Sequence, residues 1–312
     1  MKIAITGALG HIGSRLIREL PSAFRDAEIV MLDDLSTQRY CSLFGLPPEG
    51  RYRFVEADIL TADLEAAFAG CDVVVHLAGI TDAPSSFEIR EQVERVNLEG
   101  TKRVALACLR AGSALIFPST TSVYGSQAET VDEDCPAEDL KPQSPYAESK
   151  LRAEQWLTSA GQAEGIRFVL CRFGTIFGTS PGMRFHTAIN KFCWQAVTGQ
   201  PLTVWRTALQ QERPYLELGD AVRAIEFIVE KKLYDGRIYN VVTTNTSVSR
   251  IVEIISRHVP DVSIQYVDTK IMNQLSYRVS SARFERLGIA FRGDLGRGIK
   301  ETIDLLKGIR QW

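Results

Sequence analysis

Six short apolar runs alternate with longer stretches of helical periodicity in the first 174 residues, and this alternation constrains the fold more than any other feature. The runs are KIAIT (2–6), EIVMLD (28–33), RYRFVEAD (51–58), CDVVVHLAG (71–79), ALIFPST (114–120) and IRFVLCRFG (166–174). The helical stretches fall near residues 12–20, 61–68, 87–110 and 145–160. Strands joined through helices run parallel and are covered on both faces. We therefore expect an α/β fold with a doubly wound parallel sheet.

The rhythm changes after residue 174, and this predicts a second lobe. A loop-like stretch, FGTSPGMRF, leads into helical and strand-like segments of mixed order. Residues 217–245 return to the earlier pattern, with the helix AVRAIEFIVEKK followed by the strand RIYNVV. We predict a dinucleotide-binding domain from residues 1–173 plus about 217–245. Residues 174–216 plus 246–312 would form a smaller α+β substrate lobe that closes a cleft at the carboxyl ends of the strands.

Composition excludes several classes of function. A net charge of -2 and a pI near 6.2 give no electrostatic basis for binding nucleic acid or an anionic membrane. No apolar run reaches membrane-spanning length, and the first residues lack the layout of a signal peptide. The six cysteines are scattered without metal-ligand spacing, so we expect free thiols, no metal and a cytoplasmic protein.

The stretch TGALGHIG carries three glycines, Gly7, Gly10 and Gly13, between the first strand and the first helix. In that context Gly7 would permit a tight turn, Gly10 a close approach to a pyrophosphate, and Gly13 close packing of helix on strand. Amide N–H groups at the helix start would face the phosphates. The three-residue spacing departs from the strict fingerprint, so a plain strand-to-helix turn is the alternative.

An acidic residue, Asp33, ends the second strand 20 residues after Gly13. A carboxylate there accepts hydrogen bonds from both ribose hydroxyls and repels a 2′-phosphate, which favours NAD over NADP. The alternative is an aspartate that caps its own turn beside Asp34 and Ser36. Arg39 lies nearby and leaves NADP possible.

A second group of candidates lies around FPSTTSVYG and SPYAESK. Tyr146 and Lys150 are four residues apart, so they share one face of the predicted helix. An ammonium beside a phenol stabilises the phenolate and lowers the phenol pKa toward that of a general base. A hydroxyl from Ser119–Ser122, at a strand end, could bond to both Tyr146 and a substrate. The alternatives are a solvated helix face and a loop that satisfies its own backbone.

Taken together, the motifs resemble the extended short-chain dehydrogenase/reductase family, in its nucleotide-sugar epimerase/dehydratase branch (UDP-glucose 4-epimerase-like). They occur in one order: TGALGHIG, LDDLS, EADI, GCDVVVHLAG, VNLEGT, FPSTTSVYG, PYAESK, RFGTIFG and RPYLELGDAVRA, with a weaker match in YRVSSARFERLG. The resemblance implies a Rossmann-type sheet, an NAD cofactor and a nucleotide-sugar substrate, most simply a UDP-sugar.

The resemblance also implies roles for individual residues. The catalytic residues would be Tyr146 as general base, Lys150 as its pKa modulator and Thr120 as the partner hydroxyl. The cofactor-binding residues would be Gly7, Gly10, His11, Ile12, Gly13, Asp33, Asp34, Asp58, Ile59, Leu77, Ala78, Gly79, Asn97, Tyr146 and Lys150. The substrate-binding residues would be Thr120, Thr175, Arg184, Asn190, Arg213 and Arg278. Surface ion pairs are the alternative for the arginines.

Two departures from the family pattern bear on the reaction. Family dehydratases place Asp-Glu directly after the catalytic threonine, whereas this chain has Thr121 and Ser122. Thr175 stands where many relatives carry asparagine at the sugar diphosphate, and Thr81 where some epimerases carry lysine, so the exact sugar stays open. The first departure counts against water elimination. We therefore expect an NAD-dependent C4 epimerase that acts through a transient 4-keto sugar.

Three alternatives are a nucleotide 4-keto-6-deoxysugar reductase, a 4,6-dehydratase and a non-catalytic dinucleotide-binding regulator. The family also implies a homodimer formed through the helices near residues 87–110 and 145–160.

Overall fold

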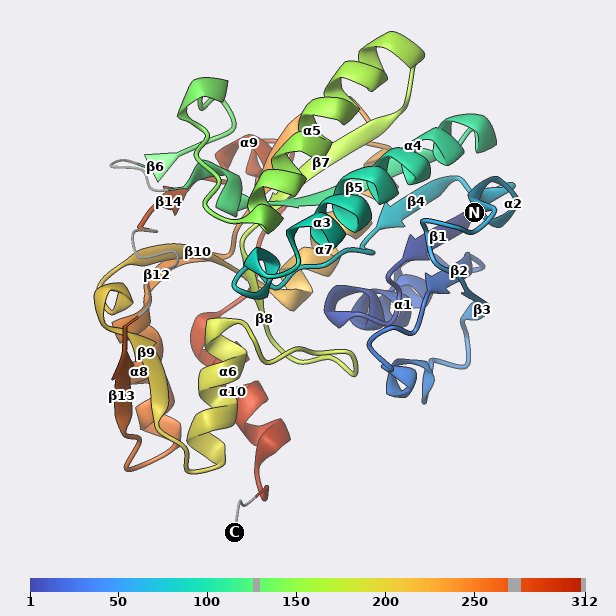
Figure 1. Cartoon of the computed structure of the whole chain (residues 1–312). Helices are drawn as coiled ribbons and strands as arrows, with labels where there is room; N and C mark the ends of the chain where they lie inside the picture. Colours follow the sequence, from blue (N-terminus) through green and yellow to red (C-terminus); the bar gives the residue numbers. More distant parts are fainter. Residues whose placement is uncertain (126–129, 269–275, 310–312) are drawn as a thin grey trace.

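A seven-stranded parallel sheet forms the centre of the molecule in the computed structural model, which describes residues 1–125, 130–268 and 276–309 (Figure 1). Its spatial order is β11-β7-β5-β4-β1-β2-β3. The strands are β1 (Lys2–Thr6), β2 (Glu28–Asp33), β3 (Arg51–Glu56), β4 (Val73–His76), β5 (Ala114–Thr120), β7 (Phe168–Phe173) and β11 (Ile238–Val241). The chain order reverses between β1 and β4, as in doubly wound nucleotide-binding sheets. The predicted fold class is confirmed.

Helices cover both faces of this sheet (Figure 1). On one face, α1 (His11–Ala23) and α7 (Leu218–Lys231) pack against residues such as Ile3 and Ile5. On the other face, α2 (Leu64–Phe68), α4 (Gly100–Ala111) and α5 (Pro145–Glu164) pack against Ala4 and Val30. Alternate residues of β1 thus enter two different cores, which explains why its central residues Ile3–Ile5 are all apolar.

The predicted helical stretch 87–110 is divided into several pieces. It contains η2 (Ser85–Phe87), α3 (Arg90–Glu94), a π-helical turn η3 (Arg95–Glu99) and then α4. A π turn widens the helix and often marks a functional position. Here it carries Asn97, whose side chain is 1% exposed.

A second lobe lies beside the carboxyl ends of the main strands (Figure 1). Its sheets are β12-β10-β8 and β13-β9, formed by β8 (Thr175–Phe177), β9 (Leu202–Trp205), β10 (Glu212–Glu217), β12 (Thr244–Ser247) and β13 (Ile264–Val267). Its core also contains α6 (Ala188–Val197), α8 (Val248–His258) and α10 (Leu295–Leu306). Smaller elements are η1 (Tyr40–Leu43), η4 (Thr121–Tyr124), β6 (Thr130–Val131), η5 (Ala137–Asp139), η6 (Arg206–Ala208), β14 (Arg278–Val279) and α9 (Ala282–Glu285).

The C-terminal segment does not lie wholly within the second lobe. The Phe284 ring of α9 lies 5.1 Å from the Tyr239 ring of β11 and 5.6 Å from the Phe227 ring of α7, within the first core. The domain boundaries drawn from the sequence stay a prediction.

No helix in the described ranges is long and apolar enough to cross a membrane.

Candidate active site

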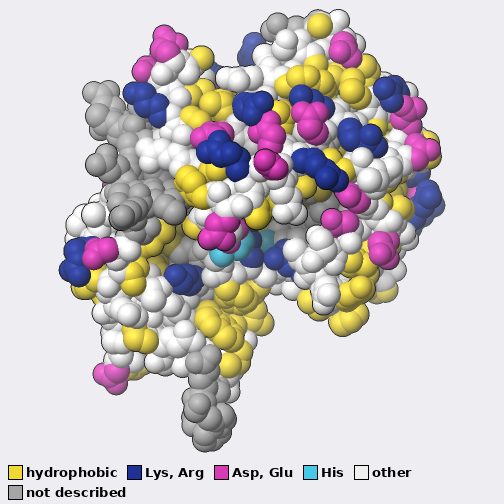
Figure 2. All heavy atoms as spheres, viewed as in Figure 1, with side chains coloured by type: hydrophobic (Ala, Val, Ile, Leu, Met, Phe, Trp, Pro, Cys, Tyr) yellow, Lys and Arg dark blue, Asp and Glu magenta, His cyan; other side chains and the backbone are white. Residues whose placement is uncertain are grey.

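A cavity of about 1390 Å³ opens between the two lobes, and most of the predicted site residues line it. Figure 2 shows the hollow from outside, with histidine and basic side chains gathered in it. Among the residues that line it are Gly7, Gly10, His11, Ile12, Gly13, Asp33, Asp34, Asp58, Ile59, Leu77, Ala78, Gly79, Thr120, Tyr146, Lys150, Thr175, Arg184 and Arg213. Asn97, Asn190 and Arg278 are predicted site residues that do not line it.

The glycine turn forms a close-fitting backbone cradle at one end of the cavity. Gly7 has φ +66, and a Cβ there would lie 2.6 Å from the Ala78 amide nitrogen. A Cβ at Gly13 would lie 2.6 Å from the Gly7 carbonyl oxygen. The first turn of α1 begins after Gly10 without a side-chain cap, so its amide N–H groups stay available to an anion. These features fit a dinucleotide pyrophosphate.

Asp33 is both a turn residue and a cavity residue. Its Oδ2 accepts a hydrogen bond from the Leu9 amide at 3.0 Å, and its Oδ1 accepts one from the Leu35 amide at 3.1 Å. Burial raises the pKa of this carboxyl, and the two amides oppose the shift. Each carboxylate oxygen keeps a further acceptor position, so the turn-capping role and the predicted ribose contact are compatible.

The catalytic candidates meet where β5 ends beside the start of α5. The Ser144 hydroxyl caps α5 by accepting from the Ala147 amide at 3.2 Å, and Pro145 opens the helix. This start places Tyr146 and Lys150, one turn apart, on the face of α5 that lines the cavity. The Lys150 ammonium donates to the Pro118 carbonyl at 2.9 Å. Burial lowers its pKa to about 8.

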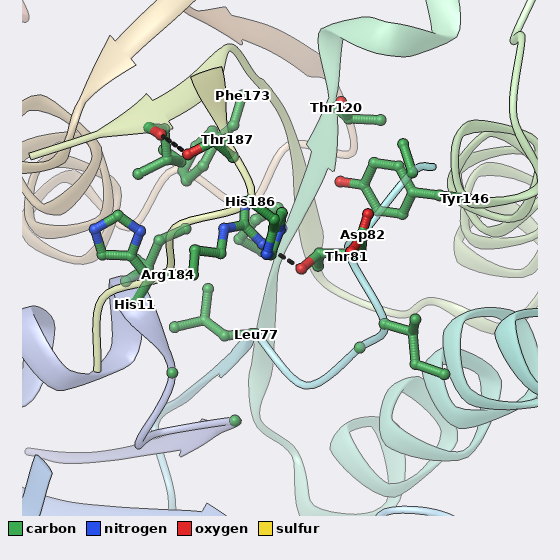
Figure 3. Close-up of a pocket in the computed structure, with 18 of the residues that line it drawn as sticks. His11, Leu77, Thr81, Asp82, Thr120, Tyr146, Phe173, Arg184, His186 and Thr187 are labelled. Atoms are coloured by element: carbon green, nitrogen blue, oxygen red, sulfur yellow. Dashed lines mark hydrogen bonds between the residues drawn. The ribbon is translucent and has the colours of Figure 1, made fainter. Parts of the chain in front are cut away.

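The cation that acts on the Tyr146 phenol comes from the other lobe. Burial raises the pKa of Tyr146, whereas the positive charge of Arg184 and a hydrogen bond with the Thr120 hydroxyl lower it. Figure 3 shows Thr120, Tyr146 and Arg184 around the same space. Lys150, the modulator that the sequence predicts, also lines the cavity, and the Pro118 carbonyl uses one of the three N–H donors of its ammonium.

A chain of buried hydrogen bonds supports the floor of the cavity. The Thr6 hydroxyl lies 2.7 Å from His76 Nδ1, and His76 Nε2 lies 3.1 Å from the Thr101 hydroxyl. Thr101 in turn donates to the Asn97 carbonyl at 2.5 Å, so its oxygen accepts from His76 Nε2–H. Nδ1 therefore accepts from Thr6. Burial lowers the pKa of His76 to about 3, and it stays neutral.

Asn97 continues this chain toward the catalytic helix. Its Oδ1 accepts from the Ile80 amide at 2.8 Å, and its Nδ2 donates to the Ile80 carbonyl at 2.9 Å. Nδ2 also lies 3.0 Å from the Ser149 hydroxyl, which donates to the Tyr146 carbonyl at 2.8 Å. Asn97 thus lies behind the cavity rather than in its lining, and joins the loop after β4 to α5.

Comparison with known proteins identifies a family of NAD-dependent enzymes, which agrees with the dinucleotide cradle described above. The model of the NAD dependent epimerase/dehydratase family matches residues 3–241. The chain belongs to this family. NAD is its cofactor, and the glycine cradle and Asp33 are the features here that fit it.

Similar proteins include both epimerases and a dehydratase. An uncharacterized UDP-glucose epimerase of Bacillus subtilis, YtcB, is 32% identical over 82% of this chain and 81% of its own length. A trifunctional UDP-glucose 4,6-dehydratase/3,5-epimerase/reductase of Arabidopsis thaliana is 29% identical over 99% of this chain, which spans only 47% of that protein. The crystal structure of UDP-glucuronic acid 4-epimerase from Bacillus cereus, with UDP-glucuronic acid and NAD, has a TM-score of 0.88 at 25% identity, covering 98% of this chain and 99% of that one.

The second lobe of this family member supplies cations to the far end of the cavity. Lys191 of α6 and Arg213 of β10 line it, and the Arg213 guanidinium lies 5.7 Å from the centre of the Trp205 ring. Two other predicted substrate residues do not line the cavity and bond to other parts of the protein. Asn190 accepts from the Gly178 amide at 3.3 Å and donates to the Arg184 carbonyl at 3.0 Å. Arg278 pairs with Glu212 at 2.9 Å.

Several lining residues are not among the sequence-based site predictions. They are Asp82, His186, Lys191 and Tyr277. They lie on loops and a helix, where nothing in the local sequence distinguishes a cavity residue from a surface one. Ser119, one of the hydroxyl candidates at the strand end, also lines the cavity. Its hydroxyl is buried without a partner in the described residues, so it can bond to a ligand.

Within the residues that the structure describes, no group of three or more His, Cys, Asp or Glu side chains could hold a metal ion.

Proposed function

We propose that this protein is an NAD-dependent epimerase that inverts C4 of a UDP-sugar, with Tyr146 as the general base. The observation that carries the proposal is the meeting of Thr120, Tyr146 and Lys150 in one cavity with the glycine cradle. The UDP-sugar epimerases among its relatives support the same reaction class.

The residues divide the work in the following way. Tyr146 takes the proton from the C4 hydroxyl, and the Thr120 hydroxyl stabilises the phenolate by hydrogen bonding. Arg184 adds a positive charge that favours the phenolate, which burial alone would disfavour. NAD, which the glycine cradle and Asp33 would hold, would supply the hydride acceptor and donor that inversion at C4 through a keto sugar requires. Tyr146 then gives its proton back to the new hydroxyl.

The positions that follow Thr120 favour epimerisation over water elimination. The Thr121 hydroxyl donates to the Phe173 carbonyl at 3.3 Å and Thr121 does not line the cavity, whereas Ser122 lines it without an acid group. A dehydratase of this family needs an acid and a base there. We therefore rank the 4,6-dehydratase and the 4-keto-6-deoxysugar reductase below the epimerase, and a non-catalytic regulator lowest, because Thr120, Tyr146 and Lys150 are all present.

The cationic end of the cavity supports a nucleotide diphosphate as the substrate handle. We propose that Arg213 binds the diphosphate together with Lys191, while Thr175 and Arg184 lie nearer the sugar. The predicted contact of Arg278 with substrate is less favoured, because its guanidinium already pairs with Glu212.

Proton NMR of the purified protein with UDP-glucose, UDP-glucuronic acid, UDP-N-acetylglucosamine and dTDP-glucose, without added cofactor, tests the proposal. We expect the anomeric signal of a C4 epimer to appear with one UDP-sugar. A 4-keto-6-deoxy product would instead identify a dehydratase. In a separate assay, stoichiometric consumption of NAD(P)H with a nucleotide 4-keto-6-deoxysugar would identify a reductase.

We also propose a homodimer formed through α3 and α5. These helices pack side by side, and Phe87 and Ile89, at 39% and 37% exposure, lie just before α3. Light scattering after size-exclusion chromatography tests this, with a mass near 34.7 kDa contradicting it.

The six free cysteines fit a reducing compartment, so we propose a cytoplasmic location.

A further inference from the structure

We propose that Glu154 and Arg172 position Lys150: this buried ion pair places a negative charge one helical turn from the ammonium and leaves the ammonium free to face the cavity. The pair joins α5 to β7, which lie side by side in Figure 1. Neither residue lines the cavity. The proposal deepens the proposed function and rests on it for any effect on turnover, but the charge of Lys150 can be measured without a sugar.

Glu154 continues the row of catalytic candidates along α5. Tyr146, Lys150 and Glu154 follow one another at four-residue intervals, so they share one face of the helix. This face is turned inward, because Lys150 is 6% exposed and Glu154 is 2% exposed. A carboxylate four residues after a lysine is within reach of its ammonium, and the two would ordinarily form an ion pair.

Arg172 of β7 binds the Glu154 carboxylate instead. Its Nε lies 3.2 Å from both carboxylate oxygens, and its Nη2 donates to Oε2 at 2.7 Å. The guanidinium also lies 4.8 Å from the centre of the Tyr124 ring. Such a fork-shaped contact fixes the orientation of the carboxylate. The ammonium of Lys150 is therefore left to bond elsewhere.

The Lys150 ammonium is directed to the end of β5. It donates to the Pro118 carbonyl at 2.9 Å and lies 4.4 Å from the centre of the Phe117 ring. Two of its three N–H donors remain for a ligand or side chain in the cavity. Burial lowers the pKa of Lys150 to about 8, and the Glu154 charge opposes this shift. Glu154 thus acts on Lys150 as a charge, while Pro118 receives the hydrogen bond.

The other titratable groups near Lys150 in the described part of the chain do not supply this negative charge. His76 of β4 is neutral, and the Lys150 charge contributes to lowering its pKa. Tyr124 of η4 is protonated, because burial raises its pKa to about 12. The other ion pairs of α5 are exposed and are formed with α3: Arg90–Glu148 and Arg152–Glu94. Glu154 is therefore the acid that favours the charged form of Lys150.

The test is the titration of Lys150 in the protein with NAD bound and no sugar. It is followed by NMR of protein that contains lysine labelled with ¹³C at Cε, and the spectrum of Lys150→Met identifies the Lys150 signal. We expect Glu154→Gln to lower the titration midpoint by about one pH unit or more, because a negative charge is lost while Arg172 stays. Arg172→Met should raise the midpoint, because the freed carboxylate then pairs with the ammonium directly.

The double variant Glu154→Gln/Arg172→Met keeps the test valid if a single variant fails to fold, since replacing a whole buried ion pair is tolerated better than losing one partner. Its Lys150 midpoint should also fall, because the carboxylate is the charge that acts on Lys150. Where a variant is active, the alkaline limb of its kcat–pH profile should shift with the Lys150 midpoint. The expected midpoints without epimerase activity would support the pair and count against the function proposed above.

Asp220→Asn is the matched control. Asp220 is also a buried carboxylate that pairs with an arginine, Arg223 at 3.0 Å, but it lies on α7 at the opposite face of the sheet. This variant should lose stability and leave the Lys150 midpoint unchanged. An unchanged midpoint in folded Glu154→Gln, or shifts of the same sign in Glu154→Gln and Arg172→Met, would overturn the proposal and leave the pair as a structural contact only.

Discussion

The two ends of the cavity are built differently. The cofactor end is made mainly of backbone, held by the close contacts of Gly7 and Gly13. The substrate end is made of long side chains, notably Arg184, Lys191 and Arg213, which reach in from the second lobe. A backbone site is fixed by local sequence and tolerates no added atoms, whereas a side-chain site depends on how distant segments meet.

The largest effect is expected at the junction of the two ends. Tyr146→Phe removes the general base and should lower kcat by about 10²–10⁴-fold. If the two ends bind their ligands independently, bound NAD and the affinity for the UDP-sugar should stay close to the original values. Steady-state kinetics, NAD content and titration calorimetry measure the three quantities.

Tyr124→Phe is the control for that substitution. Its hydroxyl donates to Asn240 Oδ1 at 2.9 Å in a buried position, and it does not line the cavity. Stability should fall by about 1 kcal/mol with no change in kcat. A kcat for Tyr146→Phe within a few-fold of the original would exclude Tyr146 as the general base.

The next largest effect concerns the backbone end. Gly7→Ala places a Cβ 2.6 Å from the Ala78 amide and also forces alanine to φ +66. We expect bound NAD to fall at least tenfold and the free energy of unfolding to fall by about 2–4 kcal/mol. Absorbance of the purified protein and urea denaturation measure these changes.

Gly70→Ala separates the two causes. Gly70 has φ +72 but open space around it, so alanine there should cost only about 1 kcal/mol and leave NAD binding unchanged. If Gly7→Ala behaves like Gly70→Ala, the close fit between the glycine turn and the loop after β4 does not matter for the cofactor.

The same contrast explains what the sequence could predict. The parallel strands, the glycine turn, Asp33 and the Tyr146/Lys150 pair follow from short-range patterns, because hydrophobic periodicity, a turn or an i, i+4 spacing fixes the local geometry. The proximity of Arg184 to Tyr146 and the close contact of Gly182 with the glycine turn depend on segments far apart in the sequence. No local pattern carries that information. The π turn at Asn97 was likewise hidden within a continuous helical periodicity.

The substrate end should respond more weakly, and selectively. Arg213→Ala removes a cavity guanidinium and should raise the KM for the UDP-sugar by about 10–100-fold, since hydrogen bonds to charged groups contribute about 1.5–3 kcal/mol. Arg278→Ala loses an exposed ion pair and should change KM by about twofold or less. Neither should alter bound NAD. Equal effects of the two variants would return Arg278 to the substrate site.

The smallest expected effect is a pH dependence of stability that comes from His76, in the buried hydrogen-bond chain beneath the cofactor end. His76 is fully buried with its pKa lowered to about 3, below its unfolded value of 6.5. The unfolded chain therefore binds the extra proton first as the pH falls. The stability that the neutral ring provides is complete above pH 6.5 and is lost progressively toward pH 3. Between pH 7 and pH 5 this should remove about 1–2 kcal/mol from the free energy of unfolding.

His76→Gln keeps a neutral polar side chain without the titration, so its stability should be lower at pH 7 but should depend less steeply on pH. Urea denaturation at pH 7, 6 and 5 measures the slope, with His258→Gln as the control because His258 is exposed on α8. If His76→Gln and the unmodified protein lose stability in parallel, the hydrogen-bond chain from Thr6 to Asn97 does not depend on a neutral His76. The acid sensitivity of the cofactor end would then originate from another buried group, of which His11 is the first candidate.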